Sequence, residues 1–315
     1  MNTQPQEETP ESYELSYKIG VAENKIPNFV RRWKMFIHMF KTFASRLDWG
    51  YFAIFDGHAG FQASKWCGSN LHSIIEEKLL NNDNEDGSAN VDVRDILNES
   101  FLIVDKQINT QLEGNSGCTA AVCVLRWELP DDNDNANDND NGKSTGNADE
   151  IQTNTNSNNS KDLRQHKRKL YTANVGDSRI VLFRNGHSIR LTYDHKASDL
   201  LEMKRVEEAG GLIMKSRVNG MLAVTRSLGD KFFDSLVISN PFTTSVELID
   251  SDEFLIIACD GLWDVIDDQD ACELIQDIKD PKEAAKKLVK YALENGTTDN
   301  VTVNGCNVVN IYVCT

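Results

Sequence analysis

The sequence lacks three features that would place it in common classes of protein. No stretch approaches eighteen consecutive apolar residues, so no membrane-spanning helix is predicted. The first fourteen residues are acidic and polar instead of basic and then apolar, which argues against a secretory signal peptide. The seven cysteines show no paired close spacing of the zinc type and several lie in apolar runs, as reduced buried thiols do. We therefore expect a cytoplasmic and nuclear protein.

Positive charge is also scarce. The 315 residues include 33 Lys and Arg against 49 Asp and Glu, which gives a formal net charge of −16. This balance argues against a nucleic-acid backbone or an anionic membrane surface as the main partner. It also disfavours a metal-dependent nuclease, because nucleic-acid binding calls for a basic surface stripe. We expect neither a nucleic acid nor a membrane among the partners.

A polar low-complexity segment accounts for part of this acidity. Between Asp131 and Ser160 the chain has seven acidic residues, one lysine and ten asparagines. Such a segment cannot bury enough apolar surface to fold, so we expect an Asn/Asp insert at about 130–162 within a single domain at 15–315. Residues 1–14 are expected to form a disordered tail, because they offer almost nothing to bury.

Hydrophobic patterning predicts both helices and strands. We expect helices at residues 62–80, 93–112, 200–209, 268–278 and 281–294. We expect strands at residues 51–55, 118–127, 169–175, 179–184 and 254–258. Asn185-Gly186 is a hairpin signal, and Gly210-Gly211 is typical of a helix end. Strands in hairpin-like series with helices grouped between them favour an α+β fold with antiparallel sheets.

Aspartates end three short segments that are far apart in the chain. Asp56 and Asp260 each follow an apolar run, and Asp299 lies in Thr298-Asp299-Asn300 near the end of the sequence. Apolar runs bounded by glycine are typical of buried strands, so these carboxylates should lie at strand ends, where the core opens to solvent. Converging carboxylates repel one another unless a cation lies between them. Oxygen ligands alone favour Mg²⁺ or Mn²⁺.

Five segments, in this order along the chain, resemble the motifs of the metal-dependent Ser/Thr protein phosphatases of type 2C. They are Phe55-Asp56-Gly57-His58-Ala59-Gly60, Asn174-Val175-Gly176-Asp177-Ser178-Arg179, Thr225-Arg226-Ser227-Leu228-Gly229-Asp230, Ala258-Cys259-Asp260-Gly261-Leu262-Trp263-Asp264 and Asp299-Asn300-Val301-Thr302-Val303. The resemblance is strongest to small fungal members that act on stress-activated MAP kinase pathways. It implies a β-sandwich of two mainly antiparallel sheets flanked by helix pairs, in four αββα layers. It also implies hydrolysis of phosphoserine and phosphothreonine in protein substrates.

The resemblance assigns roles to residues of the first and last motifs. Asp56 would bridge two metal ions, with the Gly57 carbonyl in one coordination sphere and Asp260 and Asp299 in the other. Two such ions lower the pKa of a bridging water and stabilise in-line attack on phosphorus. His58 would protonate the leaving Ser or Thr oxygen, because imidazole titrates near working pH.

Other acidic and basic residues of the motifs allow two interpretations. The resemblance makes Asp177 and Asp264 candidates for a weaker third metal, whereas a turn aspartate and a helix-start aspartate are the structural alternatives. Asp230 is expected to fix a loop. Structural roles are also favoured for three further residues, namely Arg179, Arg226 and His195.

The chain departs from the family in its first motif. No acidic residue occurs from residue 25 to residue 47, so the expected Met-Glu-Asp is missing. Its absence would weaken metal and substrate binding together. The alternative function is therefore that of a catalytically impaired pseudophosphatase that binds phosphoproteins. Arg31, or Arg32 beside it, is the candidate for the arginine that grips the substrate phosphate.

A shift of the reading frame accounts for this departure and for a second one. Codons for Glu-Asp-Val-His-Thr-Tyr, displaced by one base, encode the Lys-Met-Phe-Ile-His-Met found at residues 34–39. A one-base insertion likewise explains the sequence after Val303. The hypothesis is that residues 26–41 and 304–315 are read out of frame. It predicts a last core strand cut short after Val303.

Overall fold

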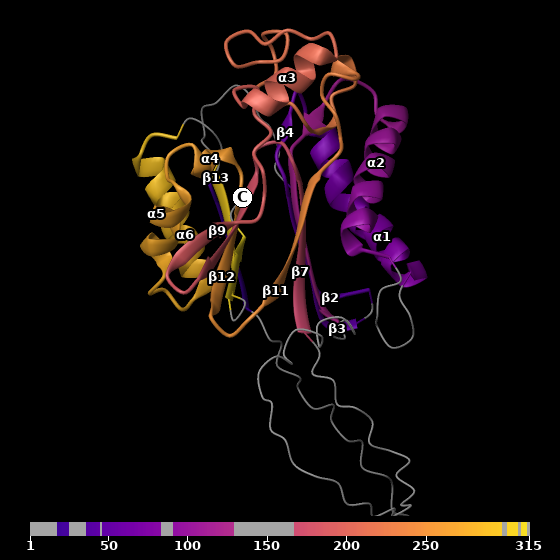
Figure 1. Ribbon diagram of the computed structural model, residues 1–315. Helices are drawn as coiled ribbons and strands as arrows, with labels where there is room; N and C mark the ends of the chain where they lie inside the picture. The colour runs from indigo at the N-terminus through magenta and orange to yellow at the C-terminus, as the bar shows by residue number, and fades with distance from the viewer. Residues whose placement is uncertain are drawn as a thin grey trace, which may run out of the picture.

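The protein is built from four layers, with two facing sheets in the middle and a pair of helices on each outer side (Figure 1). The computed structural model describes residues 18–24, 36–44, 46–82, 91–128, 167–297, 301–307 and 310–313. Helices α1 (Gln62–Asn82) and α2 (Val93–Gln111) cover one sheet. Helices α5 (Asp268–Ile275) and α6 (Pro281–Glu294) cover the other. The predicted αββα arrangement is confirmed.

The first sheet is antiparallel throughout and has the strand order β11-β7-β6-β3-β2. Its strands are β2 (Phe36–Phe43), β3 (Arg46–Phe55), β6 (Ala120–Glu128), β7 (Lys167–Val175) and β11 (Phe242–Leu248). Side chains alternate between the faces, as the period of a strand requires. Along β3, Tyr51, Ala53 and Phe55 face the helices. Phe52 and Ile54 face the second sheet.

The second sheet has the order β1-β13-β14-β12-β8-β9. Its strands are β1 (Lys18–Asn24), β8 (Arg179–Arg184), β9 (His187–Arg190), β12 (Asp252–Ala258), β13 (Val301–Asn307) and β14 (Asn310–Val313). Strand β14 runs parallel to β12 and to β1, and the other pairings are antiparallel. Asn185 and Gly186 form the predicted β8–β9 hairpin with φ angles of 50° and 76°.

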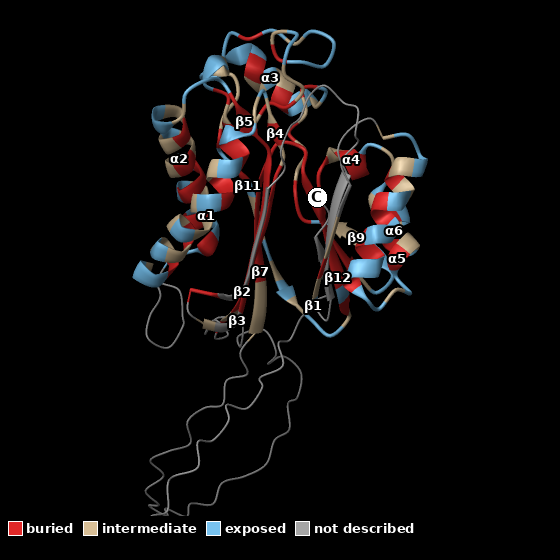
Figure 2. Ribbon diagram, turned by 180° about the vertical axis from the view of Figure 1, so that it is seen from behind, coloured by how far each residue is buried: buried red, intermediate tan, exposed pale blue. Residues whose placement is uncertain are grey.

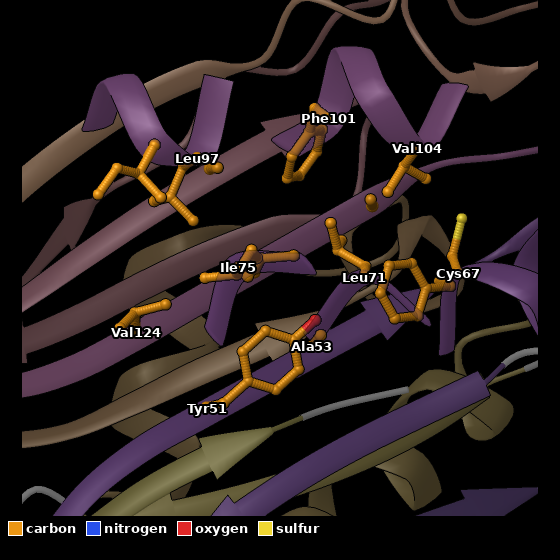
Figure 3. Close-up of a cluster of buried hydrophobic side chains, with 14 of the residues drawn as sticks. Tyr51, Ala53, Cys67, Leu71, Ile75, Leu97, Phe101, Val104 and Val124 are labelled. Atoms are coloured by element: carbon orange, nitrogen blue, oxygen red, sulfur yellow. The ribbon is translucent and has the colours of Figure 1, made fainter. Parts of the chain in front are cut away.

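Three buried layers hold the sheets and helices together. Between the sheets, Phe52 and Ile54 pack with Leu255 and Ile257 of β12. The layer between the first sheet and its helices contains Tyr51, whose neighbours from α1, α2 and β6 appear in Figure 3. Buried residues line the central strands β3, β6, β8 and β12 and the inner helix faces, whereas the outer helix faces are exposed (Figure 2). These central strands are therefore apolar on both faces, which explains why they read as continuous apolar runs.

Aspartate side chains cap the N-termini of four helices, α2, α3, α5 and α6. The side chain of Asp92 accepts a hydrogen bond from the backbone of α2, and Asp267 and Asp280 do the same for α5 and α6. Asp199 caps α3 (Leu200–Glu208), which ends before Gly210 at φ 87°. These caps satisfy backbone N–H groups that have no partner within the helix.

A small third sheet lies at one end of the sandwich, beside α3 and α4 (Asp260–Trp263) (Figure 1). It has the order β10-β5-β4 and consists of β4 (Gly57–His58), β5 (Gly117–Cys118) and β10 (Leu228–Gly229). The short 3-10 helix η2 (Lys231–Phe233) follows β10. No helix in the part of the chain that the structure describes has the length and apolar character needed to cross a membrane.

The predicted helices and strands are all present, with ends displaced by a few residues. The expected break after Val303 is wrong, because β13 continues to Asn307. Five cysteines with described side chains, Cys67, Cys118, Cys123, Cys259 and Cys272, are buried and free, as predicted. The N-terminal tail at 1–14 and the insert at 130–162 lie outside the described residues, so the domain boundaries stay predictions.

Candidate metal centre

Two of the three predicted carboxylates meet at the end of the sandwich that carries the small sheet. Asp56 follows the last residue of β3 in the first sheet, and Asp260 is the first residue of α4, just after β12 in the second sheet. One ligand atom each from Asp56, Cys259 and Asp260 lies within 4.8 Å of the other two. Asp299 lies outside the described residues. The two sheets therefore each contribute one carboxylate to a common point.

This set of donors fits a hard divalent cation. Carboxylate oxygens suit Mg²⁺ or Mn²⁺, and a cation would offset the repulsion between the two acids. The third atom, Cys259 Sγ, is a soft donor that such ions do not prefer. It comes from a buried residue directly before Asp260 and was not anticipated as part of the cluster. Gly57 is paired with Cys118 in the small sheet, which fixes the backbone beside Asp56.

His58 lies next to this point and is held by Asp230. Its Nε2 atom is 2.6 Å from Asp230 Oδ2. Burial lowers the pKa of His58, but the charge and hydrogen bond of Asp230, together with the charges of Asp56 and Asp177, outweigh this effect, so its pKa is raised above 6.5. Asp230 belongs to the loop after β10, as expected, but its contact with His58 was missed. No local pattern indicates a partner 172 residues away in the sequence.

The candidates for a third metal, Asp177 and Asp264, are joined by a lysine. Lys196 Nζ is 3.0 Å from Asp264 Oδ1 and 3.6 Å from Asp177 Oδ2. Burial raises the pKa of Asp177, although the Lys196 ammonium acts in the opposite direction. The alternative of a helix-start aspartate is wrong for Asp264, because this residue follows the end of α4 and Asp260 begins that helix. Lys196 was not anticipated in this cluster.

The two motif arginines form ion pairs within the fold, as predicted. Arg179 binds Asp194 and Asp268, whose carboxylates lie 2.5 Å and 2.6 Å away. Arg226 binds Glu202 at 2.5 Å. These pairs fasten the segments after β9 and around α3. Arg31 lies outside the described residues, so its predicted role is not tested.

His195 has a structural environment. Its side chain is buried, and Nδ1 lies 3.3 Å from the Gly176 carbonyl oxygen. Its ring packs edge-on against Tyr193 with the ring centroids 5.4 Å apart. Burial lowers its pKa to about 4, and the nearby Arg226 acts in the same direction. A buried neutral imidazole is therefore built into the loop that follows β9.

Comparisons with known proteins point to one family. Residues 19–128 and 145–301 match the family model described as protein phosphatase 2C. The chain is 67% identical over 297 residues to protein phosphatase 2C homolog 1 of Saccharomyces cerevisiae, covering 94% of both sequences. It is 38% identical over 312 residues to the homolog 1 of Schizosaccharomyces pombe, covering 98% of this chain and 78% of that protein.

Solved structures share the fold at lower identity. A sex-determining protein of C. elegans superposes with a TM-score of 0.70 at 23% identity, over 94% of this chain and 65% of that one. A phosphatase of Toxoplasma gondii superposes with a TM-score of 0.63 at 20% identity, over 92% and 95% of the two chains. The chain thus belongs to the protein phosphatase 2C family, the metal-dependent serine/threonine phosphatases that act on phosphorylated proteins.

Proposed function

We infer that the reaction uses two divalent cations, Mg²⁺ or Mn²⁺, held by Asp56, the Gly57 carbonyl, Asp260 and Asp299. The observation that carries this proposal is the convergence of the Asp56 and Asp260 carboxylates from opposite sheets. When bound, a pair of ions lowers the pKa of a bridging water and stabilises in-line attack on phosphorus. Asp56, at the end of β3, is the proposed bridging ligand.

His58 is the proposed proton donor for the leaving Ser or Thr oxygen. Asp230 favours its protonated form, and the ring lies two residues beyond the proposed bridging carboxylate. An alkoxide is a poor leaving group, so a positioned acid accelerates its departure by typically about 10²- to 10⁴-fold. Asp177 and Asp264 are proposed to take up a weaker third cation, which would have to displace the Lys196 ammonium.

A phosphothreonine peptide tests the two-ion proposal. We expect hydrolysis in Mn²⁺ and none in EDTA. Asp56→Asn and Asp260→Asn should each lower kcat by more than about 100-fold, because substitution of a residue that only supports a metal ligand costs up to about 100-fold. Calorimetric titration with Mn²⁺ should show weaker binding in both variants. Asp252→Asn is the matched control, because Asp252 is a buried acid bound to Arg184 away from the site. Unchanged Mn²⁺ binding in both site variants would contradict the proposal.

The pseudophosphatase alternative rests on the missing acidic motif. Phe36 opens β2 and pairs with Phe55, the residue before Asp56. Position 36 therefore lies in the strand next to the one that leads to Asp56, and the restored chain carries Met35→Glu and Phe36→Asp. Activity of the present sequence with Mn²⁺ favours the enzyme. Activity that appears only in the restored chain favours the catalytically impaired pseudophosphatase. It would also indicate that the functional protein is encoded by the repaired reading frame of the gene.

The proposed substrates are activated stress-responsive MAP kinases, encountered in the cytoplasm and nucleus, so the protein would be a negative regulator of stress signalling. The resemblance of the five motifs to small fungal type 2C phosphatases supports this choice. The test compares release of phosphate from the phosphothreonine of an activated MAP kinase with release from an unrelated phosphoprotein. Equal kcat/KM for both substrates would refute kinase specificity.

A further inference from the structure

We propose that Asp230 is a positioning residue that holds the Nε2–H of His58, so that Nδ1 is the nitrogen that protonates the leaving oxygen. The proposal rests on the role proposed for His58. As a water oxygen forms a new bond to phosphorus, the P–O bond to the leaving oxygen breaks, its electron pair stays on that oxygen, and a proton moves to that oxygen from Nδ1. The other ring proton stays on Nε2 and remains hydrogen-bonded to Asp230.

The contact between the two residues defines the direction of their hydrogen bond. His58 Nε2 and Asp230 Oδ2 are 2.6 Å apart, and the Asp230 side chain is 2% exposed. An ionised carboxylate only accepts hydrogen bonds, so Nε2 is the donor. A ring nitrogen held in this way fixes both the tautomer and the orientation of an imidazole. Nδ1 is then the ring nitrogen left for proton exchange.

The small sheet is shaped to permit this contact. Its central strand β5 places Gly117 opposite His58 of β4 on one side and opposite Gly229 of β10 on the other. A Cβ atom at position 117 would lie 2.2 Å from Asp230 Oδ2. The carboxylate therefore reaches His58 by passing over a residue without a side chain. The close approach of the carboxylate therefore requires glycine at position 117.

Asp230 is itself fixed by its surroundings. Its Oδ2 atom also accepts a hydrogen bond of 2.5 Å from Ser227 Oγ. Its backbone N–H donates to the Ser116 carbonyl, and the preceding N–H of Gly229 donates to Asp105 Oδ1 at 2.7 Å. Asp230 adopts a left-handed φ of 51°, which is uncommon for a residue other than glycine. Such fixation is expected of a group that orients another side chain, and also of one that only fastens a loop.

Leaving-group dependence separates positioning from loop fastening. A proton donor matters for an alkoxide leaving group and matters little for p-nitrophenolate, which departs readily without a proton. We expect Asp230→Asn to lower kcat on a phosphothreonine peptide by about 10- to 100-fold, as loss of a supporting hydrogen bond typically does. On p-nitrophenyl phosphate the loss should be less than about 3-fold, because the proton donor contributes little there.

A double-mutant cycle tests whether Asp230 acts through His58. Residues that act as a unit give non-additive effects. We expect Asp230→Asn to lower kcat by less than about 2-fold when His58 is already alanine, because the group it positions is gone. Gly117→Ala should reproduce the selective loss, since it displaces the carboxylate without changing its chemistry. Asp252→Asn is the control for a buried acid elsewhere and should affect both substrates equally.

A spectroscopic readout does not depend on turnover. The imidazole ¹⁵N signals of His58, assigned by their absence in His58→Ala, should show a proton on Nε2 that Asp230→Asn releases to exchange with solvent. The proposal is overturned if Asp230→Asn affects both substrates equally, if its effect persists without His58, or if the neutral imidazole carries its single proton on Nδ1. If His58→Ala itself shows no leaving-group dependence, the proton-donor role fails first, and the ¹⁵N signals then decide the Asp230 contact alone.

Discussion

Acidification should destabilise the protein through one buried histidine. In His195, Nδ1 is placed to donate to the Gly176 carbonyl, and Nε2 has no hydrogen-bond partner within the described part of the chain. A proton on Nε2 would therefore be buried without an acceptor, with Arg226 nearby as a further unfavourable charge. These effects lower the pKa of His195 from 6.5 to about 4. The unfolded chain binds this proton more readily than the folded one.

The sign and size of the effect follow from this difference in pKa. The contribution of neutral His195 to the free energy of unfolding is fully present above about pH 6.5 and is lost as the pH falls towards 4. One pKa unit corresponds to about 1.4 kcal/mol. Between pH 7 and pH 5 the loss should reach about 2 kcal/mol, and by pH 4 about 3 kcal/mol.

Urea denaturation at several pH values measures this loss against a matched variant. His195→Asn keeps an amide N–H near the position of Nδ1 but does not titrate in this range. EDTA should be present in all samples, because Asp177 follows Gly176 and lies near the candidate cation sites. The stability advantage of the unmodified chain over the variant should shrink by about 2 kcal/mol from pH 7 to pH 5. A difference that stays constant over this range would refute the reasoning.

Three further predictions concern packing and charge. Gly20→Ala should lower the free energy of unfolding by about 1 to 3 kcal/mol in urea denaturation, because the added Cβ would lie 2.1 Å from the backbone nitrogen of Lys282. Leu71→Ala should lower the free energy of unfolding by about 2 to 5 kcal/mol in the same assay, since Leu71 is fully buried. As its control, Leu80→Ala should change the free energy of unfolding by less than about 0.5 kcal/mol, because the Leu80 side chain is 48% exposed. Asp260→Asn should abolish metal-dependent activity yet stabilise the EDTA-treated protein by about 1 kcal/mol, because it removes one of two repelling carboxylates. A lower melting temperature for this variant in EDTA would contradict that account.

The central elements could be predicted because their burial leaves a local pattern. Strand β12 is buried on both faces, with Ile256 towards α5 and α6 and Ile257 towards the first sheet, so its sequence reads as one apolar run. Strand β11 has only half-buried and exposed residues and gave no such signal. The strands of the small sheet are two residues long, which is too short for any period to show.

The site residues could be predicted only where a carboxylate follows the end of a buried strand. Asp56 and Asp260 follow buried strands, and the two residues lie close together because the two sheets pack face to face. The places of Lys196 and Asp230 depend on loops whose conformation is set by tertiary contacts. No local rule relates such loops to the residues they approach.

A cation bound by Asp56 and Asp260, as proposed, would connect the two sheets, because each sheet supplies one of the carboxylates. Its affinity would then depend on the spacing that Phe52, Leu255 and their neighbours impose between the sheets. A substitution deep in that core would alter metal affinity without touching a ligand, and the ion would in turn resist separation of the sheets. Thermal stability and metal affinity would therefore be thermodynamically coupled, so a substitution that changes one should also change the other.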